Sequence, residues 1–172
     1  PMVVAEQKKR HWGQVVPIEE VEQILDMTVN IVRVPCGCRS TLRGLYDARF
    51  CFGVTSFREG WAEAFEYPDY SSHLEKLTAE EAKKAIQKLD RNGLVHSIWT
   101  FITPYIGGVC NCTATDCLAM RGRLHSGLQI AFPFFKAEHV GVIDLESCSG
   151  CRDCLKNCNF GAISYSPSLH KC

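Results

Sequence analysis

The chain has 172 residues, 46% of them hydrophobic, which suits either one ordinary domain or a compact domain followed by a small metal-stabilised module. Its 19 basic and 19 acidic residues balance, so no overall charge favours nucleic acid or an anionic membrane surface. The first residues lack the pattern of a secretory signal, and the longest apolar stretch, residues 98–109, is too short and too interrupted for a membrane span of about 20 residues. We therefore expect a soluble, cytoplasmic protein with no membrane span and no nucleic-acid partner.

The first predicted helix begins after Pro17. Apolar residues recur every three or four positions from Ile18 to Val32, and glutamates are concentrated in the first turn. Because Pro35 disfavours helix at the residue before it, the helical pattern stops there. The pair Cys36 and Cys38 that follows is therefore expected in a loop.

Two four-residue patterns match a helix capping box, at residues 56–59 and 78–81. The first predicts a short helix over about residues 57–65. The second predicts a longer helix with a regular apolar stripe, which ends at Gly93. The chain then leaves that helix in extended form at residues 94–95 and enters a glycine-rich, aromatic segment.

Eleven cysteines are the outlying feature of the composition. In a reducing compartment such residues serve as metal ligands or reactive thiols more often than as disulfides. The odd total and the two Cys-x-Cys pairs fit metal ligation better than a secreted disulfide framework. The cysteine spacing is therefore expected to reflect metal binding.

The run Cys148, Cys151, Cys154 and Cys158 has the spacing of two, two and three intervening residues that binds 4Fe-4S clusters. The two-residue gaps let three thiolates converge on a cube of iron and sulfide, while the longer gap points the fourth thiolate away. Four thiolates can also bind zinc, but zinc ribbons use two separated Cys-x2-Cys pairs. The spacing therefore favours iron–sulfur chemistry.

Over about residues 139–172 the chain resembles the bacterial-type two-cluster ferredoxin domain. The resemblance implies one-electron transfer through clusters held by these four cysteines. It departs from the family at Asn159, where a proline usually follows the fourth cysteine, and in lacking a second cysteine run. The fourth ligand of the first cluster is therefore open. We favour a chain that continues past Cys172 with the second run; otherwise Cys158 or Cys172 folds back onto one cluster, or an upstream cysteine contributes.

Six further cysteines form two groups, Cys36, Cys38 and Cys51 in the first half and Cys110, Cys112 and Cys117 in the second. They are either buried core residues, since reduced cysteine packs as a small hydrophobe, or ligands of a metal site where their loops meet.

The wider chain, in motifs such as residues 34–39, 93–96 and 109–112, is similar to ferredoxin-domain proteins that carry an N-terminal cysteine-rich domain. This resemblance implies a second metal site, iron–sulfur or zinc, at the upstream cysteines. It also makes Arg39 and His96 supporting or proton-handling groups; otherwise Arg39 forms a surface ion pair and His96 is an ordinary residue at a helix exit.

The expected fold is α+β, with a mainly helical, cysteine-rich domain over residues 1–136 and a ferredoxin-like 4Fe-4S module with short paired strands over residues 137–172. The leading function is an electron-transfer protein or subunit of an oxidoreductase complex, with redox proteins as partners and no catalytic residue of its own. The second is a redox enzyme whose upstream cysteines form a substrate-binding metal site. The third is a structural zinc-binding interaction module.

Overall fold

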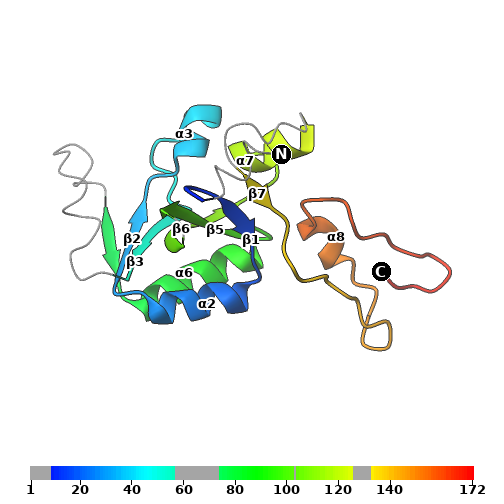
Figure 1. Ribbon diagram of the computed structural model, residues 1–172. Helices are drawn as coiled ribbons and strands as arrows, with labels where there is room; N and C mark the ends of the chain where they lie inside the picture. The colour runs from blue at the N-terminus through cyan, green and yellow to red at the C-terminus, as the bar shows by residue number, and fades with distance from the viewer. Residues whose placement is uncertain (1–8, 57–73, 103, 126–132) are drawn as a thin grey trace.

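The computed structural model describes residues 9–56, 74–102, 104–125 and 133–172. The short helix predicted at residues 57–65 lies outside the described residues. Figure 1 shows a sheet domain flanked by helices and a separate C-terminal module to one side of it. Among the described residues, none of the helices has the length and apolar character needed to cross a membrane.

A seven-stranded sheet in the order β4-β2-β3-β6-β5-β1-β7 forms the centre of the N-terminal domain. Neighbouring strands are antiparallel except β1 and β7, which are parallel. The strands are β1 Gly13–Val15, β2 Asn30–Val34, β3 Cys51–Thr55, β4 Glu75–Leu77, β5 Val95–Ile102, β6 Tyr105–Cys112 and β7 Phe134–Phe135.

The prediction of a mainly helical first domain is not confirmed, because this sheet supplies much of its described part. Strands β5 and β6 form a long antiparallel pair. They come from the glycine-rich, aromatic segment, in which the glycines interrupt the alternation of apolar and polar residues that would have predicted strands. A β-carbon at Gly107 would collide with the ring of Phe101, so glycine there lets the aromatic side chain pack across the neighbouring strand.

Helices α2 (Ile18–Met27) and α6 (Ala79–Arg91) pack side by side on one face of the sheet, as Figure 1 shows. Their fully buried residues, which include Leu25 and Ile86, meet Phe52 of β3 in the main core. Both helices were predicted. The first is shorter than expected, because residues 30–34 pair with β3 as a strand instead of continuing the helix.

The capping box of α6 is formed as its sequence predicts. The hydroxyl oxygen of Thr78 accepts a hydrogen bond from the backbone N–H of Glu81 at 3.3 Å. The Glu81 carboxylate in turn accepts one from the backbone N–H of Thr78 at 2.8 Å. These bonds satisfy donors that the first helical turn leaves unpaired.

On the other face of the sheet lie the short helices α3 (Gly37–Arg43) and α7 (Leu118–His125), as Figure 1 shows. The expectation that Cys36 and Cys38 share a loop is wrong, because Cys38 lies within α3 and Cys36 immediately precedes it. Proline restricts only the residue before it, so a helix can begin soon after Pro35.

The C-terminal module, residues 137–172, contains one short helix, α8 (Asp153–Asn157). The paired strands expected there are reduced to an isolated bridge between Ser166 and Lys171. None of its residues is buried. The module therefore has no hydrophobic core of its own.

Candidate metal centres

The structure brings Cys172 to the first three cysteines of the ferredoxin motif. The pKa of the Cys172 thiol is raised to about 11, first by its hydrogen bond with Cys154 and then by burial and neighbouring thiolates. The thiolates that act on it belong to Cys148, Cys151 and Cys154. Of the sources considered for a fourth ligand, Cys172 thus lies beside the other three.

Backbone amides surround the sulfur of Cys148. The N–H groups of Cys172 and Gly150 donate to it and lower the pKa of its thiol. Hydrogen bonds from amides to sulfur favour the thiolate, which is the form that binds metal. They are also among the contacts that set the potential of a cluster.

The thiol of Cys158 has a similar environment of its own. Its sulfur accepts a hydrogen bond from the backbone N–H of Ala162 at 3.3 Å. The N–H of Phe160 lowers the pKa of this thiol most, followed by those of Ala162, Ile163 and Gly161. Neighbouring backbone amides therefore favour the thiolate form of Cys158.

The six upstream cysteines line one pocket of about 780 Å³ between β3, β6, α3 and the start of α7. We call it the cysteine pocket, and its thiols belong to Cys36, Cys38, Cys51, Cys110, Cys112 and Cys117. The rest of its wall is mostly apolar and includes Phe52, Trp99 and Phe101. Residues separated by up to 81 positions thus face one space.

Within the pocket the thiols form two contact groups. The first trio is Cys36, Cys51 and Cys110, and the second trio is Cys38, Cys112 and Cys117. In the first, the sulfurs of Cys51 and Cys36 are 3.4 Å apart, and Cys51 stands opposite Cys110 across β3 and β6. In the second, the Cys117 thiol makes hydrogen bonds with both Cys112 and Cys38.

Crowding raises the pKa values of four of these thiols, those of Cys36, Cys38, Cys51 and Cys117. The hydrogen bond with Cys112 is the largest cause that raises the pKa of Cys117, to about 11. The pKa values of Cys36 and Cys38 are raised further, first by hydrogen bonds with Cys51 and Cys117 and then by burial. Metal binding must therefore release protons from this pocket.

Among the residues that the structure describes, no three Cys, His, Asp or Glu side chains already stand in metal-binding geometry. Thiolates bound to zinc at about 2.3 Å are about 3.8 Å apart. The sulfurs of Cys36 and Cys51, at 3.4 Å, are closer than that. A bound metal would spread the thiols from their present contacts.

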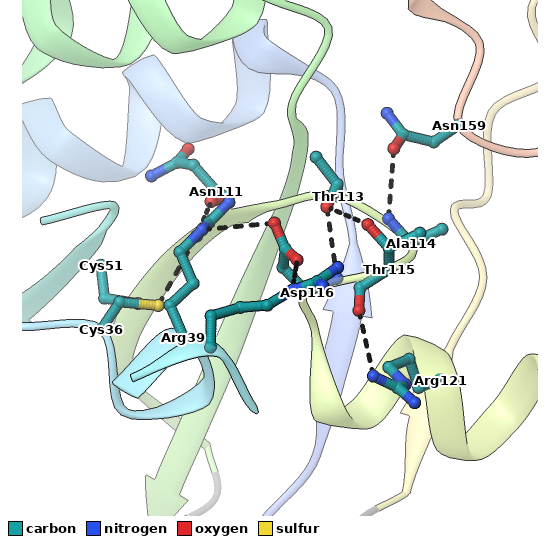
Figure 2. Close-up of polar contacts among 11 residues, drawn as sticks. Cys36, Arg39, Cys51, Asn111, Thr113, Ala114, Thr115, Asp116, Arg121 and Asn159 are labelled. Carbon is teal, nitrogen blue, oxygen red and sulfur yellow. Dashed lines mark hydrogen bonds and ion pairs between the residues drawn. The ribbon is translucent and has the colours of Figure 1, made fainter. Parts of the chain in front are cut away.

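Arg39 provides a buried positive charge beside the pocket, with only 4% of its surface exposed. Its Nη1 lies 3.6 Å from the sulfur of Cys36, and its Nε lies 3.6 Å from a carboxylate oxygen of Asp116 (Figure 2). Its guanidinium also covers the ring of Phe50, 3.8 Å from the ring centre. Arg39 is therefore not the surface ion-pair residue of the plainer interpretation.

His96 contacts Asn111, which in turn contacts Arg39. Its Nδ1 is 2.6 Å from Oδ1 of Asn111, and its Nε2 is 3.1 Å from a carboxylate oxygen of Asp90. Asn111 is fully buried and accepts a hydrogen bond from Arg39 through its carbonyl oxygen. With both ring nitrogens engaged, His96 is a positioning residue. The sequence analysis did not single out Asn111, although a polar residue between Cys110 and Cys112 was a signal that could have indicated this contact.

Asn159 joins the C-terminal module to the cysteine-rich domain. Its Oδ1 accepts a hydrogen bond from the backbone N–H of Ala114 at 3.1 Å, as Figure 2 shows. Its Nδ2 donates to the carbonyl oxygen of Gly93 at 2.5 Å. The residue that replaces the expected proline thus makes two contacts that proline could not make.

Comparison of the chain with models of known protein families, with curated proteins and with solved structures finds no match.

Proposed function

We propose that the protein is an iron–sulfur electron-transfer protein, or the electron-transfer subunit of an oxidoreductase complex, whose 4Fe-4S cluster is held by Cys148, Cys151, Cys154 and Cys172. The observation that carries the proposal is the contact of Cys172 with Cys148 and Cys154, where His170 lies against Gly150, in a module without a buried residue. About 36 residues cannot bury enough apolar area to offset the entropy of ordering them. A cluster fits here because its ligand bonds replace a core.

A bound 4Fe-4S cluster accepts and releases one electron at a time. The protein's part is to hold the thiolates and to donate the amide hydrogen bonds at Cys148. With Cys172 as the fourth ligand, Cys158 is left for another cluster, which is the role of the fourth cysteine in two-cluster ferredoxins. The local N–H groups around Cys158 support this assignment.

Exposed apolar side chains on the module support a redox protein as partner. Val140 and Val142 are more than four-fifths exposed, and Phe160 and Leu169 are also largely exposed. So many exposed apolar side chains on so small a module favour a surface that binds another protein. Cys151 itself is exposed, so a partner could approach the cluster closely.

A redox enzyme is the second candidate, favoured by the size and apolar lining of the cysteine pocket. Pockets of about 300–1,000 Å³ bind small organic molecules. This function would add a substrate to the electron-transfer role.

The test is the measurement of iron, acid-labile sulfide and zinc in protein purified without oxygen, followed by reduction with dithionite and electron paramagnetic resonance. We expect iron and sulfide in equal amounts, at least four of each per chain, and a signal from a one-electron-reduced cluster. Cys151→Ser should remove about four irons. Zinc without sulfide would contradict the proposal and favour the structural zinc module.

A further inference from the structure

We propose that the cysteine pocket binds an iron–sulfur cluster of its own, ligated by thiols from both trios and separate from the cluster of the C-terminal module. The site itself does not depend on the proposed function. Only its role as a second electron carrier rests on that function.

The first argument is the contrast between the pocket and an ordinary core. Protein interiors are close-packed, and cysteines that serve as small hydrophobes fill space. Here the six thiols line a pocket of about 780 Å³ together with mostly apolar residues. The main core of the domain lies elsewhere, between the sheet and α2 and α6. Cys112 and Cys117 also pack in a smaller apolar cluster with Met120 and Phe134, but this cluster does not include the other four cysteines. Core packing therefore does not explain why all six line one pocket.

The second argument is the division of the thiols. A structural zinc ion and a 4Fe-4S cluster each take four cysteine ligands, so the total of six thiols does not choose between them, but their arrangement does. The thiols form two trios that lie near each other, because Cys38 of the second trio interacts electrostatically with Cys36 and Cys51 of the first. A cluster of several irons can use ligands on both sides of a wide pocket, whereas a single ion cannot.

The third argument is the surroundings of the sulfurs. Arg39 brings a buried positive charge and an N–H donor to Cys36, which would offset part of the negative charge of a thiolate-ligated cluster. The other walls, which include Trp99 and Phe101, are mostly apolar. Burial, hydrogen bonds to sulfur and nearby charge are the means by which proteins adjust cluster potentials.

The position of the pocket supports exchange of single electrons with a cluster at Cys158, the cysteine that the module's four proposed ligands leave for another cluster. Cys112 is two residues before Ala114, and Cys158 is directly before Asn159. The hydrogen bond from Ala114 to Asn159, at 3.1 Å, connects these two segments. In such an exchange one site is oxidised by one electron as the other is reduced by one, and no bond is formed or broken.

The experiment uses the full chain with two sets of substitutions and measures iron, sulfide and zinc after anaerobic purification. The triple variant Cys148→Ser, Cys151→Ser, Cys154→Ser removes the module's site and should retain about four irons or more, with equal sulfide. The double variant Cys51→Ser, Cys117→Ser removes the central thiol of each trio and should lose the iron that the triple variant retains.

A second measurement covers the case in which the double variant fails to fold. In the unaltered protein the six pocket thiols should resist alkylation, detected by mass spectrometry, until iron is removed by a chelator. Three results would overturn the inference. They are a triple variant that contains neither iron nor sulfide, a triple variant that contains zinc but no sulfide, and disulfides among the six cysteines of the unaltered protein. If the triple variant loses all its iron, the inference about the pocket fails but the proposed function of the module does not. If the triple variant keeps as much iron as the unaltered protein, the module binds no cluster, and only the proposed function fails.

Discussion

The carbonyl oxygen of His170 lies in the space that a β-carbon of Gly150 would occupy. Gly150 also has a left-handed backbone, with φ of +72°. This close approach of two segments brings Cys172, two residues after His170, beside the cysteines around Gly150. The fourth thiol thus reaches the site through a backbone contact that only glycine allows.

Gly150→Ala should therefore prevent the module's cluster from assembling, with a loss of about four irons per chain. Gly161→Ala is the matched control, because Gly161 has a similar φ of +61° but open space around its α-carbon. It should cost only about 1–2 kcal/mol of backbone strain and retain the iron. Equal iron contents in the two variants would show that the contact with His170 is unimportant.

Cys172→Ser should disturb the module's first cluster, whereas Cys158→Ser should leave it in place. The reason is that Cys172 interacts with Cys148, Cys151 and Cys154, while backbone amides surround Cys158. Iron analysis and electron paramagnetic resonance of the reduced proteins distinguish the two variants. The opposite result would assign Cys158 to the first cluster.

Removal of iron by a chelator should unfold residues 137–172 and leave the sheet domain folded. The module has no buried residue, whereas β3, α2 and α6 share a continuous apolar core. Hydrogen exchange should show lost protection in the module and unchanged protection in α6. Circular dichroism spectra that match before and after chelation would contradict the prediction.

Arg39→Gln should lower the reduction potential of the cluster proposed for the cysteine pocket by about 100 mV. A positive charge stabilises the reduced form, and one charge at about 7 Å with an effective dielectric constant of about 20 contributes about 2.4 kcal/mol. Arg43→Gln is the control, since Arg43 also pairs with Asp116, at 2.9 Å, but is half exposed. A spectroelectrochemical titration should find its potential nearly unchanged; equal shifts would mean that Arg39 acts only through Asp116.

Asn159→Ala should loosen the module from the cysteine-rich domain without loss of iron. It removes the acceptor of the Ala114 N–H and the donor to Gly93, each bond contributing about 1 kcal/mol. The Ala114 amide should exchange about five to ten times faster. Asn157→Ala, which retains the β-carbon that faces Gly93, should leave this exchange rate unchanged. An unchanged rate in Asn159→Ala would remove this residue from the interface.

Local features of the chain were predictable because neighbouring residues determine them. The capping box at Thr78 and Glu81 and the apolar stripe of α6 predict that helix from contacts within one or two turns. The spacing of Cys148, Cys151 and Cys154 is local in the same sense, since a short loop limits where its thiols can lie. Both patterns were evident in the sequence.

Contacts between distant segments were decided by the tertiary structure. Cys51 meets Cys110 because the register of β3 against β6 places them opposite each other, and a shift by one residue would point them to opposite faces. That register depends on the packing of the whole sheet against α2 and α6. The approach of Cys172 to Cys148 depends in the same way on the fit of His170 against Gly150. The sequence by itself determined which cysteines are candidate metal ligands, because spacing is local, and the tertiary structure decided which of them lie together.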